Sequence, residues 1–579
     1  KYLSNLKGDF CLSGLENVNG EDAGEAKLNE KQGIDRLVLK WSRDTRKKEV
    51  EEWVLDSLHP SKKLEQLVIQ NFGGAKFSTW IADSSFKNML SLELRNCQNC
   101  KSLSSIGRLL LLKDLSIGGL RQVHKIGAEL LGENQSNAFG SLESLCFDNM
   151  LNWEEWDLCE DDEQVSKFPS LRFLSITKCP LLLGRLPTIL QSLQKLEIYE
   201  CQRLVVSISS FPLLCELSVA GCEELVDEGS LSVQKVTSLK HVSLSNISKC
   251  SISAERIMLR FANSETFKIS GWELGSLSQI GLRLVGHRFI EIVSCPQLVS
   301  LAAEEESLQL DKIPGVESLF IRDCERLNRL PEALHAFPFI TRITLADCPR
   351  LVCFAESNFP PALKELRIVN CVNLQYLVDE KENNNKSISS NTCLLERLDI
   401  SCCPSLIWLS SRDDVCNRLQ HLKIRCCSKL SSLFLNAKLP VMLKQLFIGD
   451  CPMLECISQD FLETTDLESI VIHEEGFPTN LTSLQISNAP KIYTSLVEWG
   501  FYRLTSLQKL NISGEGCSRV VSFPEEAIGM MLPPSLTDIS IRRFENLEFM
   551  CSKGLQHLTS LQQLGIYDCP KLASLPEKD

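Results

Sequence analysis

The chain has 579 residues, a formal net charge of −13 at pH 7, 44% hydrophobic residues and 23% charged residues. This acidic balance argues against broad binding to nucleic acids or anionic membranes, because their phosphates require cationic surfaces. The sequence also lacks an uninterrupted apolar stretch of the roughly 18 residues needed to cross a bilayer. The length exceeds that of most single globular domains, whereas a stack of repeats has no such limit, since each repeat closes its core against its neighbours.

One short phrase recurs along the chain. In its clearest form it reads Leu171-x-x-Leu174-x-Ile176-x-x-Cys179, and the same four offsets return every 21 to 32 residues. The second and third positions are apolar and alternate with polar neighbours, which is typical of a β-strand with one buried face. Because each repeat supplies one such strand, we predict that successive strands pair in parallel, about 4.8 Å apart.

The fourth position of the phrase predicts where each strand ends. It is frequently cysteine, which packs as a small apolar residue and carries a weak S–H donor. Proline follows it in several repeats, for example at Pro180 and Pro349, and its fixed φ prevents further strand pairing. Few of the segments leading to the next strand carry a long helical stripe. We therefore expect short loops, 3-10 turns and occasional helix on the side opposite the sheet.

These offsets predict about 22 repeats in one domain that covers residues 1–579. In chain order, the phrases end at Leu15, Ser42, Phe72, Cys97, Leu120, Met150, Cys179, Cys201, Cys222, Ile247, Trp272, Cys295, Cys324, Cys348, Cys371, Cys403, Cys427, Cys451, Glu475, Ala489, Glu515, Phe544 and Cys569. The phrase at Glu475 is irregular, because Ala489 follows it closely. Residue 1 falls inside a phrase, so we expect the chain to be a fragment truncated at its N-terminus.

Three polar stretches interrupt the repeats: Asp44–Glu52, Glu154–Glu163 and Asp379–Thr392. The second is rich in carboxylates, and the third is rich in asparagine and serine. We expect both to be solvent-exposed loops on the convex side, and the first to be a similar loop or a short helix. Neither a spacer nor a shift in composition predicts a second domain.

The 26 cysteines allow two interpretations, a disulfide framework outside the cell or thiols in a reducing compartment. Twelve of them occupy the fourth position of the phrase. One cysteine per repeat is a stacking pattern, whereas disulfides need partnered positions, so we predict buried free thiols. In the doublets Cys402-Cys403 and Cys426-Cys427 the first cysteine points outward, so that the two outward thiols can face each other at strand spacing.

Motifs of catalysis and metal binding are missing from the sequence. Cys97-x-x-Cys100 lacks the further ligands that a tetrahedral zinc site needs, and the eight histidines are scattered. A phosphate-binding Gly-x-x-x-x-Gly-Lys-[Ser/Thr] loop is also absent from the sequence. We therefore predict that the chain is not an enzyme and has no catalytic, metal-binding or cofactor-binding residues.

The outward-facing positions of the predicted strands change sign along the chain. Earlier repeats place acids there, namely Glu93, Asp114, Asp148, Glu197, Glu200 and Glu216. The middle repeats place basic residues there, which form a predicted basic stripe of Arg322, Arg342, Arg367, Arg397, His421, Lys423 and Arg425. Phe320 and Phe447 flank the stripe as aromatic anchors for a partner. We predict that the stripe receives an acidic protein surface; the alternative is that these cations only solubilise an exposed sheet.

The repeated phrase with cysteine in its fourth position resembles the leucine-rich-repeat signature. Further phrases occur at 12–18 (Leu-Ser-Gly-Leu-Glu-Asn-Val), 37–41 (Leu-Val-Leu-Lys-Trp), 77–81 (Phe-Ser-Thr-Trp-Ile) and 153–156 (Trp-Glu-Glu-Trp). With them, the chain resembles the leucine-rich-repeat domain of plant intracellular immune receptors. The resemblance is to the coiled-coil class of nucleotide-binding leucine-rich-repeat (NLR) disease-resistance proteins.

This resemblance implies an α/β leucine-rich-repeat solenoid, curved as a horseshoe, with the parallel sheet on its concave face. It implies a monomeric sensor and autoinhibitory domain in the cytoplasm or nucleus, which binds a pathogen effector or the receptor's own nucleotide-binding module. ADP or ATP is expected only in that upstream module. Ser78 and Ser104 depart from the family phrases, in which proline is common. The alternatives are the substrate-recognition region of an F-box ubiquitin-ligase receptor and an extracellular receptor ectodomain.

Overall fold

The computed structural model describes residues 6–42, 48–132, 138–157, 167–186, 190–208, 211–227, 239–252, 261, 264–272, 288–299, 316–328, 330, 338–355, 359–378, 393–409, 416–435, 439–459, 478–496, 501–525 and 529–575. The predicted loop Asp379–Thr392 and the irregular phrase at Glu475 lie outside these residues. Most of the predicted loop Glu154–Glu163 also lies outside them.

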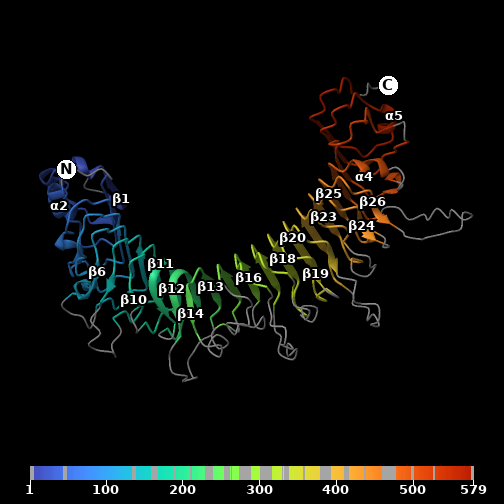
Figure 1. Ribbon diagram of the computed structural model, residues 1–579. Helices are drawn as coiled ribbons and strands as arrows, with labels where there is room; N and C mark the ends of the chain where they lie inside the picture. Colours follow the sequence, from blue (N-terminus) through green and yellow to red (C-terminus); the bar gives the residue numbers. More distant parts are fainter. Residues whose placement is uncertain are drawn as a thin grey trace, which may run out of the picture. The chain divides into compact units, whose positions relative to one another are not determined.

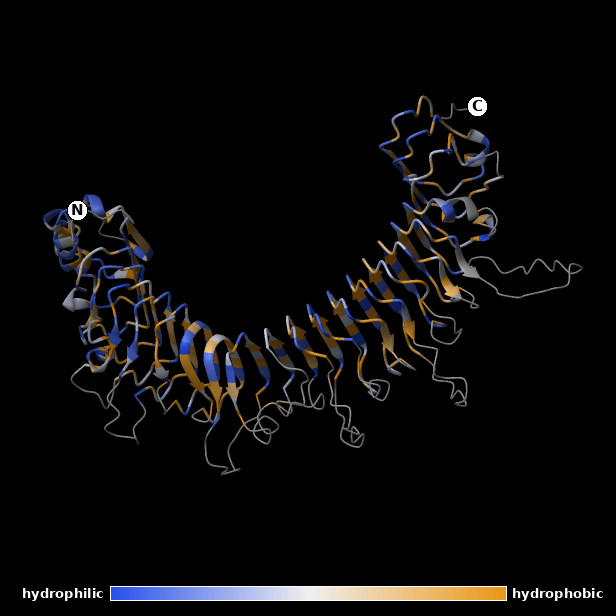
Figure 2. Cartoon of the chain, in the orientation of Figure 1, coloured by the Kyte–Doolittle hydropathy of each residue, from blue (hydrophilic) through white to orange (hydrophobic). Residues whose placement is uncertain are grey.

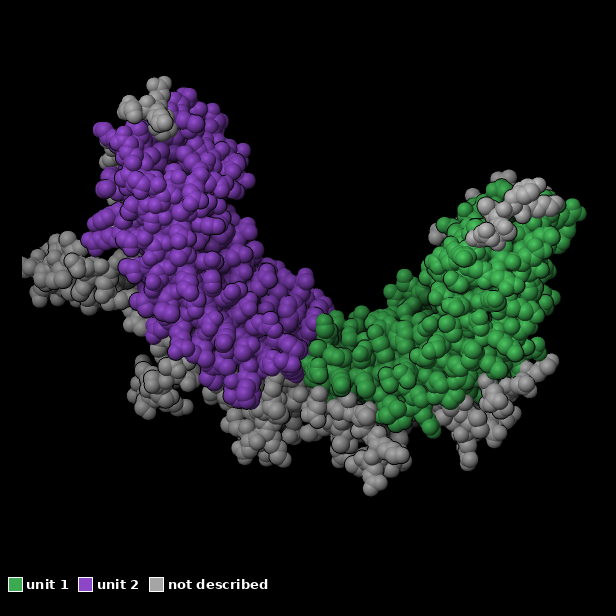
Figure 3. Space-filling model, turned by 180° about the vertical axis from the view of Figure 1, so that it is seen from behind, with its two compact units in different colours: residues 1–272, 280–282 green, residues 273–279, 283–579 purple. Residues whose placement is uncertain are grey.

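The chain divides into two compact units, drawn in different colours in Figure 3. Unit 1 comprises Lys1–Trp272 with Ile280–Leu282, and unit 2 comprises Glu273–Gln279 with Arg283–Asp579. In each unit, every described repeat contributes one strand to a parallel sheet, and the strands stack side by side in chain order (Figure 1). This arrangement confirms the predicted parallel-sheet solenoid with few helices.

The main-sheet strands coincide with the predicted phrases. In unit 1 they are β1 (Lys7–Ser13), β2 (Gly33–Lys40), β3 (Gln66–Gln70), β4 (Ser91–Arg95), β5 (Asp114–Gly118), β7 (Ser144–Asp148), β9 (Phe173–Thr177), β11 (Lys195–Ser207), β12 (Glu216–Val226), β13 (His241–Ser245) and β15 (Thr266–Ser270). In unit 2 they are β16 (Phe289–Val293), β17 (Ser318–Arg322), β18 (Arg342–Ala346), β20 (Glu365–Val369), β22 (Arg397–Ser401), β23 (His421–Arg425), β25 (Gln445–Gly449), β27 (Ser483–Ser487), β28 (Lys509–Ser513), β30 (Asp538–Arg542) and β32 (Gln563–Tyr567).

The pairing places equivalent residues of successive repeats side by side. Leu196 of β11 lies opposite Leu174 of β9, and Ile198 lies opposite Ile176. All four side chains have relative exposures of 0%, and burying each contributes about 1.5–3 kcal/mol. The residues between them face outward, so hydrophobic and hydrophilic colours alternate along the strands in Figure 2. The core therefore lies behind the sheet and leaves the sheet's outer face open.

The cysteines in the fourth position of the phrase close each repeat from inside. The Cys179 thiol donates to the carbonyl oxygen of Thr177 at 3.3 Å, and similar bonds recur in other repeats. Burial raises the pKa of Cys403 to about 12. These cysteines are free and, apart from the half-buried Cys569, buried. The structure thus confirms the prediction of buried free thiols at this position.

The residue just before the fourth position adopts a left-handed backbone that the sequence analysis did not anticipate. Asn71, Asn96 and Asn149 have φ angles of 58°, 56° and 54°. Asparagine tolerates positive φ better than most residues. The Asn96 N–H donates to the carbonyl of Gly118 at 2.7 Å, so the ladder of hydrogen bonds extends one residue past the strand. In β11 and β12 the strand itself continues through the cysteine, which corrects the prediction that each strand ends there.

The convex side carries the short turns and occasional helices that were predicted, together with short outer strands that were not predicted. In unit 1 these are η1 (Leu15–Asn17), α1 (Gly20–Glu25), η2 (Leu28–Glu30), α2 (Lys48–Ser57), η3 (Thr79–Ala82), η4 (Ile106–Arg108), β6 (Lys125–Ile126), η5 (Ala128–Leu130), β8 (Glu155–Trp156), β10 (Gly184–Arg185) and β14 (Lys249–Ser251). In unit 2 they are β19 (Cys353–Ala355), β21 (Tyr376–Val378), β24 (Ser432–Leu435), β26 (Cys456–Gln459), α4 (Pro490–Ser495), η10 (Phe501–Arg503), β29 (Ser522–Phe523), β31 (Phe549–Met550) and α5 (Ser552–Leu555). Within the described residues, none of the helices is long and apolar enough to cross a membrane.

The charged stretch Asp44–Glu52 leads into helix α2, which agrees with the predicted short helix where the structure describes it. A buried carboxylate fixes this helix to the next repeat, because Glu51 accepts the Gly73 N–H at 2.7 Å. The indole N–H of Trp80 donates to the Leu55 carbonyl at 2.9 Å and ties the end of α2 to the same repeat. These polar contacts and the fully buried side chains of Val54 and Leu55 together hold α2 in unit 1.

Candidate protein-binding face

The nine predicted site residues all lie on the outer face of the sheet in unit 2, on strands β17 to β25. The first, third and fifth residues of each strand form three rows across this face. The first row is Ser318, Arg342, Glu365, Arg397, His421 and Gln445. The middle row is Phe320, Thr344, Arg367, Asp399, Lys423 and Phe447. The last row is Arg322, Ala346, Val369, Ser401, Arg425 and Gly449.

In the middle row, Asp399 holds two of the predicted cations. Its Oδ2 lies 3.8 Å from Arg367 Nε and 3.6 Å from Lys423 Nζ. Lys423 Nζ also lies 5.8 Å from the ring centre of Phe447, within the range of a cation–π contact. The two cationic side chains are 56% and 45% exposed, so each ion pair is worth only about 0.2–1 kcal/mol. Pairs this weak can exchange for contacts with a partner.

In the last row, two further cations have aspartate partners. Arg322 Nε donates to Asp347 Oδ2 at 3.1 Å, and Arg425 Nη2 lies 3.9 Å from Asp450 Oδ2. Both aspartates follow a strand and have left-handed φ angles of 53° and 52°. Each carboxylate thereby lies beside the last residue of the preceding strand and offsets its charge.

In the first row, Arg342 and Arg397 differ from the other cations. Within the described part of the chain, neither has a carboxylate within ion-pair distance, although Glu365 lies between them in the row. Both side chains are exposed, and His421 lies opposite Arg397 on the next strand. A guanidinium without a carboxylate keeps a planar fork of N–H donors for an incoming carboxylate or phosphate.

The sequence analysis missed Asp347, Asp399 and Asp450 as parts of this face. Asp399 occupies the same strand offset as Arg367 and Lys423, whereas Asp347 and Asp450 occupy the outward position just before the fourth position of the phrase. Counting acids as well as cations at every outward position of the middle repeats identifies these three aspartates from the sequence alone. The predicted basic stripe is therefore a face on which cations alternate with acids, and its unpaired charge is concentrated in the first row.

Three of the six acids predicted on the face of unit 1 are paired in a similar way. Glu93 forms an ion pair with Arg95 of the same strand. Lys195 Nζ lies 3.0 Å from Glu197 and 3.7 Å from Glu216 on the neighbouring strand. The predicted change of sign along the chain is thus softened in both units by residues of the opposite charge.

Cys402 and Cys426 directly follow the successive strands β22 and β23 of unit 2, and neither is fully buried, as predicted from the doublets. The Cys426 thiol donates to Asp450 Oδ2 at 3.7 Å. Burial, followed by the neighbouring Cys402 and Asp450, raises the pKa of Cys426 to about 11. A thiol with so high a pKa is protonated at neutral pH and is a poor nucleophile. Among the described residues, no group of three or more His, Cys, Asp and Glu side chains is arranged to hold a metal ion.

Comparisons with known proteins agree with this architecture. Residues 1–120 match a family model described as R13L1/DRL21 LRRs. Over 100% of its length, the chain is 27% identical to disease resistance protein At3g14460 of Arabidopsis thaliana and covers 49% of that protein. It is 29% identical to disease resistance RPP13-like protein 1 of the same plant, over 60% of this chain and 30% of that protein. Among solved structures it is similar to a leucine-rich-repeat protein of Leptospira interrogans, with 15% identity over 56% of this chain and 86% of that one and a TM-score of 0.33.

The chain spans half or less of the length of these two plant relatives. Its recurring phrase, its parallel sheet with one strand per repeat and its similarity to plant resistance proteins all lead to one assignment. The chain is a leucine-rich-repeat region similar to those of plant disease-resistance proteins.

Proposed function

We propose that the outer face of the sheet in unit 2 is a protein-recognition surface of a plant innate-immune receptor. Its partner presents acidic groups and is either a pathogen effector or the receptor's own nucleotide-binding module, which the domain holds inactive. The domain acts without catalysis inside the plant cell, in the cytoplasm or the nucleus. Any ADP or ATP is bound by the upstream module and not by this chain.

The observation that carries the proposal is the contrast between Arg342 and Arg397 and the other cations of the face. Arg367 and Lys423 already share Asp399, so a partner's carboxylate has to compete with that aspartate. The two first-row arginines present charge that no described carboxylate offsets. Charge-assisted, bidentate contacts of arginine with carboxylates are stronger than neutral hydrogen bonds and impose geometry on the partner.

The paired cations support the same role in a second way. Their aspartates keep the face soluble and hold the cationic side chains near the sheet when the partner is absent. Because the pairs are half-exposed and weak, a partner that brings acids of its own can displace the aspartates at small cost. Electrostatic complementarity of this kind sets association rate and specificity, and it makes binding sensitive to salt.

Of the alternatives, the F-box receptor loses support from the comparisons. The relatives that match this chain are named as disease resistance proteins. We therefore test first whether the outer face of unit 2 binds a nucleotide-binding module.

The proposal is tested by capturing the upstream nucleotide-binding module of the same receptor, co-expressed as a separate chain, on this domain at low and high salt. We expect binding that weakens with salt and that falls at least about tenfold when both Arg342→Glu and Arg397→Glu are present. Candidate effectors can be screened in the same way, with the original domain and the Arg342→Glu, Arg397→Glu double variant as the two baits.

The matched control combines Arg36→Glu and Arg95→Glu, two exposed strand arginines on the face of unit 1. This control changes the net charge equally and is expected to leave capture unchanged. Equal loss with both double variants would mean that only the overall charge of the chain matters. Undiminished capture with the first-row variant would reject the first row as the recognition surface.

A further inference from the structure

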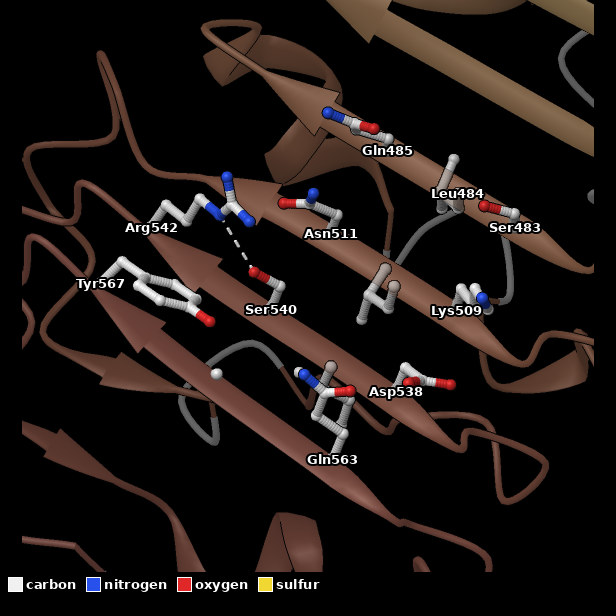
Figure 4. Close-up of a pocket in the computed structure, with 13 residues that line it drawn as sticks. Ser483, Leu484, Gln485, Lys509, Asn511, Asp538, Ser540, Arg542, Gln563 and Tyr567 are labelled. Carbon is white, nitrogen blue, oxygen red and sulfur yellow. Dashed lines mark hydrogen bonds between the residues drawn. The ribbon is translucent and has the colours of Figure 1, made fainter. Parts of the chain in front are cut away.

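The last strands of unit 2 form a hollow that adjoins the end of the basic stripe at Arg425 and Phe447. Two adjoining hollows, of about 250 Å³ and about 660 Å³, share Gln485, Asn511, Arg542 and Tyr567 as lining residues. They therefore form one continuous depression across the outer face from β25 to β32, which we name the C-terminal trough. Figure 4 shows the part of it that spans β27 to β32.

An aromatic ring lies flat against a glycine at each end of the trough. At β32, a Cβ on Gly565 would come within 2.7 Å of Tyr567 Cε2, so only glycine allows the ring this position. At β25, a Cβ on Gly449 would come within 3.0 Å of Phe447 Cε1. The Arg542 guanidinium lies 4.9 Å from the Tyr567 ring centre and extends that wall. The ends of the trough are thus apolar rings on a flat support.

The middle row of strand residues between the two rings consists of neutral polar side chains, whereas the edges of the trough carry the cations Arg425, Lys509 and Arg543 and the acids Asp450, Glu515, Asp538 and Asp568. Gln485, Asn511 and Ser540 are the middle residues of β27, β28 and β30 and point to the same side of the sheet (Figure 4). Within the described part of the chain, the carboxamides of Gln485 and Asn511 have no hydrogen-bond partner. A carboxamide both donates and accepts, which is the pairing that a peptide group offers in return.

Arg542 differs from the other charged residues that line the trough because it lies beside the neutral middle row and has no ion pair among the described residues. Its Nε donates to Ser540 Oγ at 3.1 Å, and no described carboxylate lies within ion-pair distance of it. The neighbouring Arg543 is different, because it pairs with Glu515 and lies 3.9 Å from Asp568. The bond to Ser540 and the contact with Tyr567 hold the Arg542 guanidinium in place, while its remaining N–H groups face the trough.

We propose that the C-terminal trough binds an extended peptide segment of a protein partner through an acidic residue. The carboxylate of the segment binds Arg542, its peptide groups pair with the carboxamides of Gln485 and Asn511, and its side chains pack on Phe447 and Tyr567. Four strand spacings separate the two rings, roughly 19 Å, which about six extended residues span. This inference rests on the proposed recognition role of the outer face, but it uses residues outside the basic stripe.

The test pans the 579-residue chain against two phage libraries of random heptapeptides, one with a fixed central aspartate and one with a fixed central asparagine. Asparagine has the shape of aspartate without its charge. We expect the aspartate library to be enriched at least about tenfold over the asparagine library, because the carboxylate forms charge-assisted bonds with Arg542. Enrichment of neither library, or equal enrichment of both, overturns the inference.

Variants then locate the bound peptides. Arg542→Gln is expected to reduce binding of the selected peptides at least about tenfold, and Gln485→Ala combined with Asn511→Ala to reduce it several-fold. Arg95→Gln is the matched control, because Arg95 ends strand β4 of unit 1 as Arg542 ends β30. Thermal unfolding of each variant checks that the chain still folds.

The same variants separate this inference from the proposed function. Arg342→Glu with Arg397→Glu is expected to leave peptide binding within about twofold of the original, because these residues lie outside the trough. If the selected peptides bind equally well to the Arg542→Gln chain, the inference about the C-terminal trough is wrong, whatever the result of capturing the nucleotide-binding module. If Arg342→Glu with Arg397→Glu abolishes capture of the nucleotide-binding module but no selected peptide depends on Arg542, the inference about the trough is rejected. The proposed function is then still supported.

Discussion

Helix α2 of unit 1 and the open sheet face of unit 2 use carboxylates in opposite ways. In unit 1, Glu51 is 4% exposed and accepts the Gly73 N–H at 2.7 Å. In unit 2, Asp399 lies on the open face and binds two half-exposed cations at 3.6 and 3.8 Å. Removing a buried acceptor leaves a backbone N–H without a partner, whereas an exposed aspartate can exchange its flexible partners at little cost. Burial and the type of partner therefore decide whether a carboxylate here is fixed in the fold or can exchange its partners, as the proposed recognition requires.

The largest loss of stability is expected in the first repeats of unit 1, from substituting Gly20 with alanine. A Cβ at Gly20 of α1 would lie 2.2 Å from Trp53 Cδ2 and 2.5 Å from Cγ, so the Trp53 side chain, which is 49% exposed, has to leave its contact with α1. We expect Gly20→Ala to lower the free energy of unfolding by about 1–3 kcal/mol, the usual cost of overpacking. Urea unfolding followed by circular dichroism measures the change.

Gly24 in the same helix is the control. A Cβ there meets only Ser57 Cβ at 3.9 Å, which is ordinary contact. Alanine favours a helix over glycine, so Gly24→Ala is expected to be neutral or stabilising. If both substitutions destabilised the chain equally, the close packing of Gly20 on Trp53 would not be what joins α1 to α2.

A smaller effect is expected from Glu51→Gln, which sharpens the contrast between buried and exposed carboxylates. Burial raises the pKa of Glu51 more than the hydrogen bond from Gly73 lowers it. With its folded pKa raised, this group contributes stability that is fully present below its unfolded pKa of about 4.3 and is lost as pH rises through the folded pKa. Glutamine keeps an acceptor oxygen and cannot ionise, so the variant is expected to have a higher Tm than the original chain at pH 7.

This difference in Tm is expected to shrink towards zero as the pH falls to about 4, where Glu51 is protonated in both states. Differential scanning calorimetry from pH 4 to pH 8 follows it. Glu49→Gln, on an exposed position of the same helix, removes the same charge and is expected to show no such trend. A Glu51→Gln chain that melts below the original at pH 7 would mean that the ionised carboxylate stabilises the fold.

The repeats of both units were predictable because each repeat obeys the same constraint. Leu174 and Ile176 recur at fixed offsets since every strand buries the same two side chains against the next repeat. The left-handed residue after each strand was not predicted. Asparagine is frequent there, but Lys178 and Cys402 adopt the same conformation with φ of 53° and 56°. Their conformation follows from the hydrogen bonds of neighbouring repeats, which no single residue type signals.

The candidate site was predictable in position but not in its balance of charge. The offsets correctly placed Arg342 and Arg397 on the outer face, along with the other predicted residues. They did not show that Arg322 and Arg425 have aspartate partners, because such pairing depends on residues one repeat away in the sequence. The C-terminal trough could not be inferred at all, since a hollow arises from side chains that are small or absent, such as Gly565.

Asp399→Asn, on the face of unit 2, is expected to change stability least and binding most clearly. Asparagine keeps the shape of the side chain but releases Arg367 and Lys423 from their shared carboxylate. The two lost pairs are half-exposed, so we expect the free energy of unfolding to change by about 1 kcal/mol or less. Affinity for an acidic partner is expected to rise several-fold at low salt, and the gain should fade at high salt because the released charges are screened.

Asp9→Asn is the control for this gain, because it releases Arg36 from an exposed pair of 3.5 Å on the face of unit 1. Capture of the upstream nucleotide-binding module, measured for both variants across a salt series, makes the comparison. If Asp9→Asn raised affinity as much as Asp399→Asn, net charge alone would account for the effect. A loss of affinity with Asp399→Asn would mean that this aspartate holds Arg367 and Lys423 in the geometry the partner needs, which would move Asp399 from a competitor of the partner to a part of its binding site.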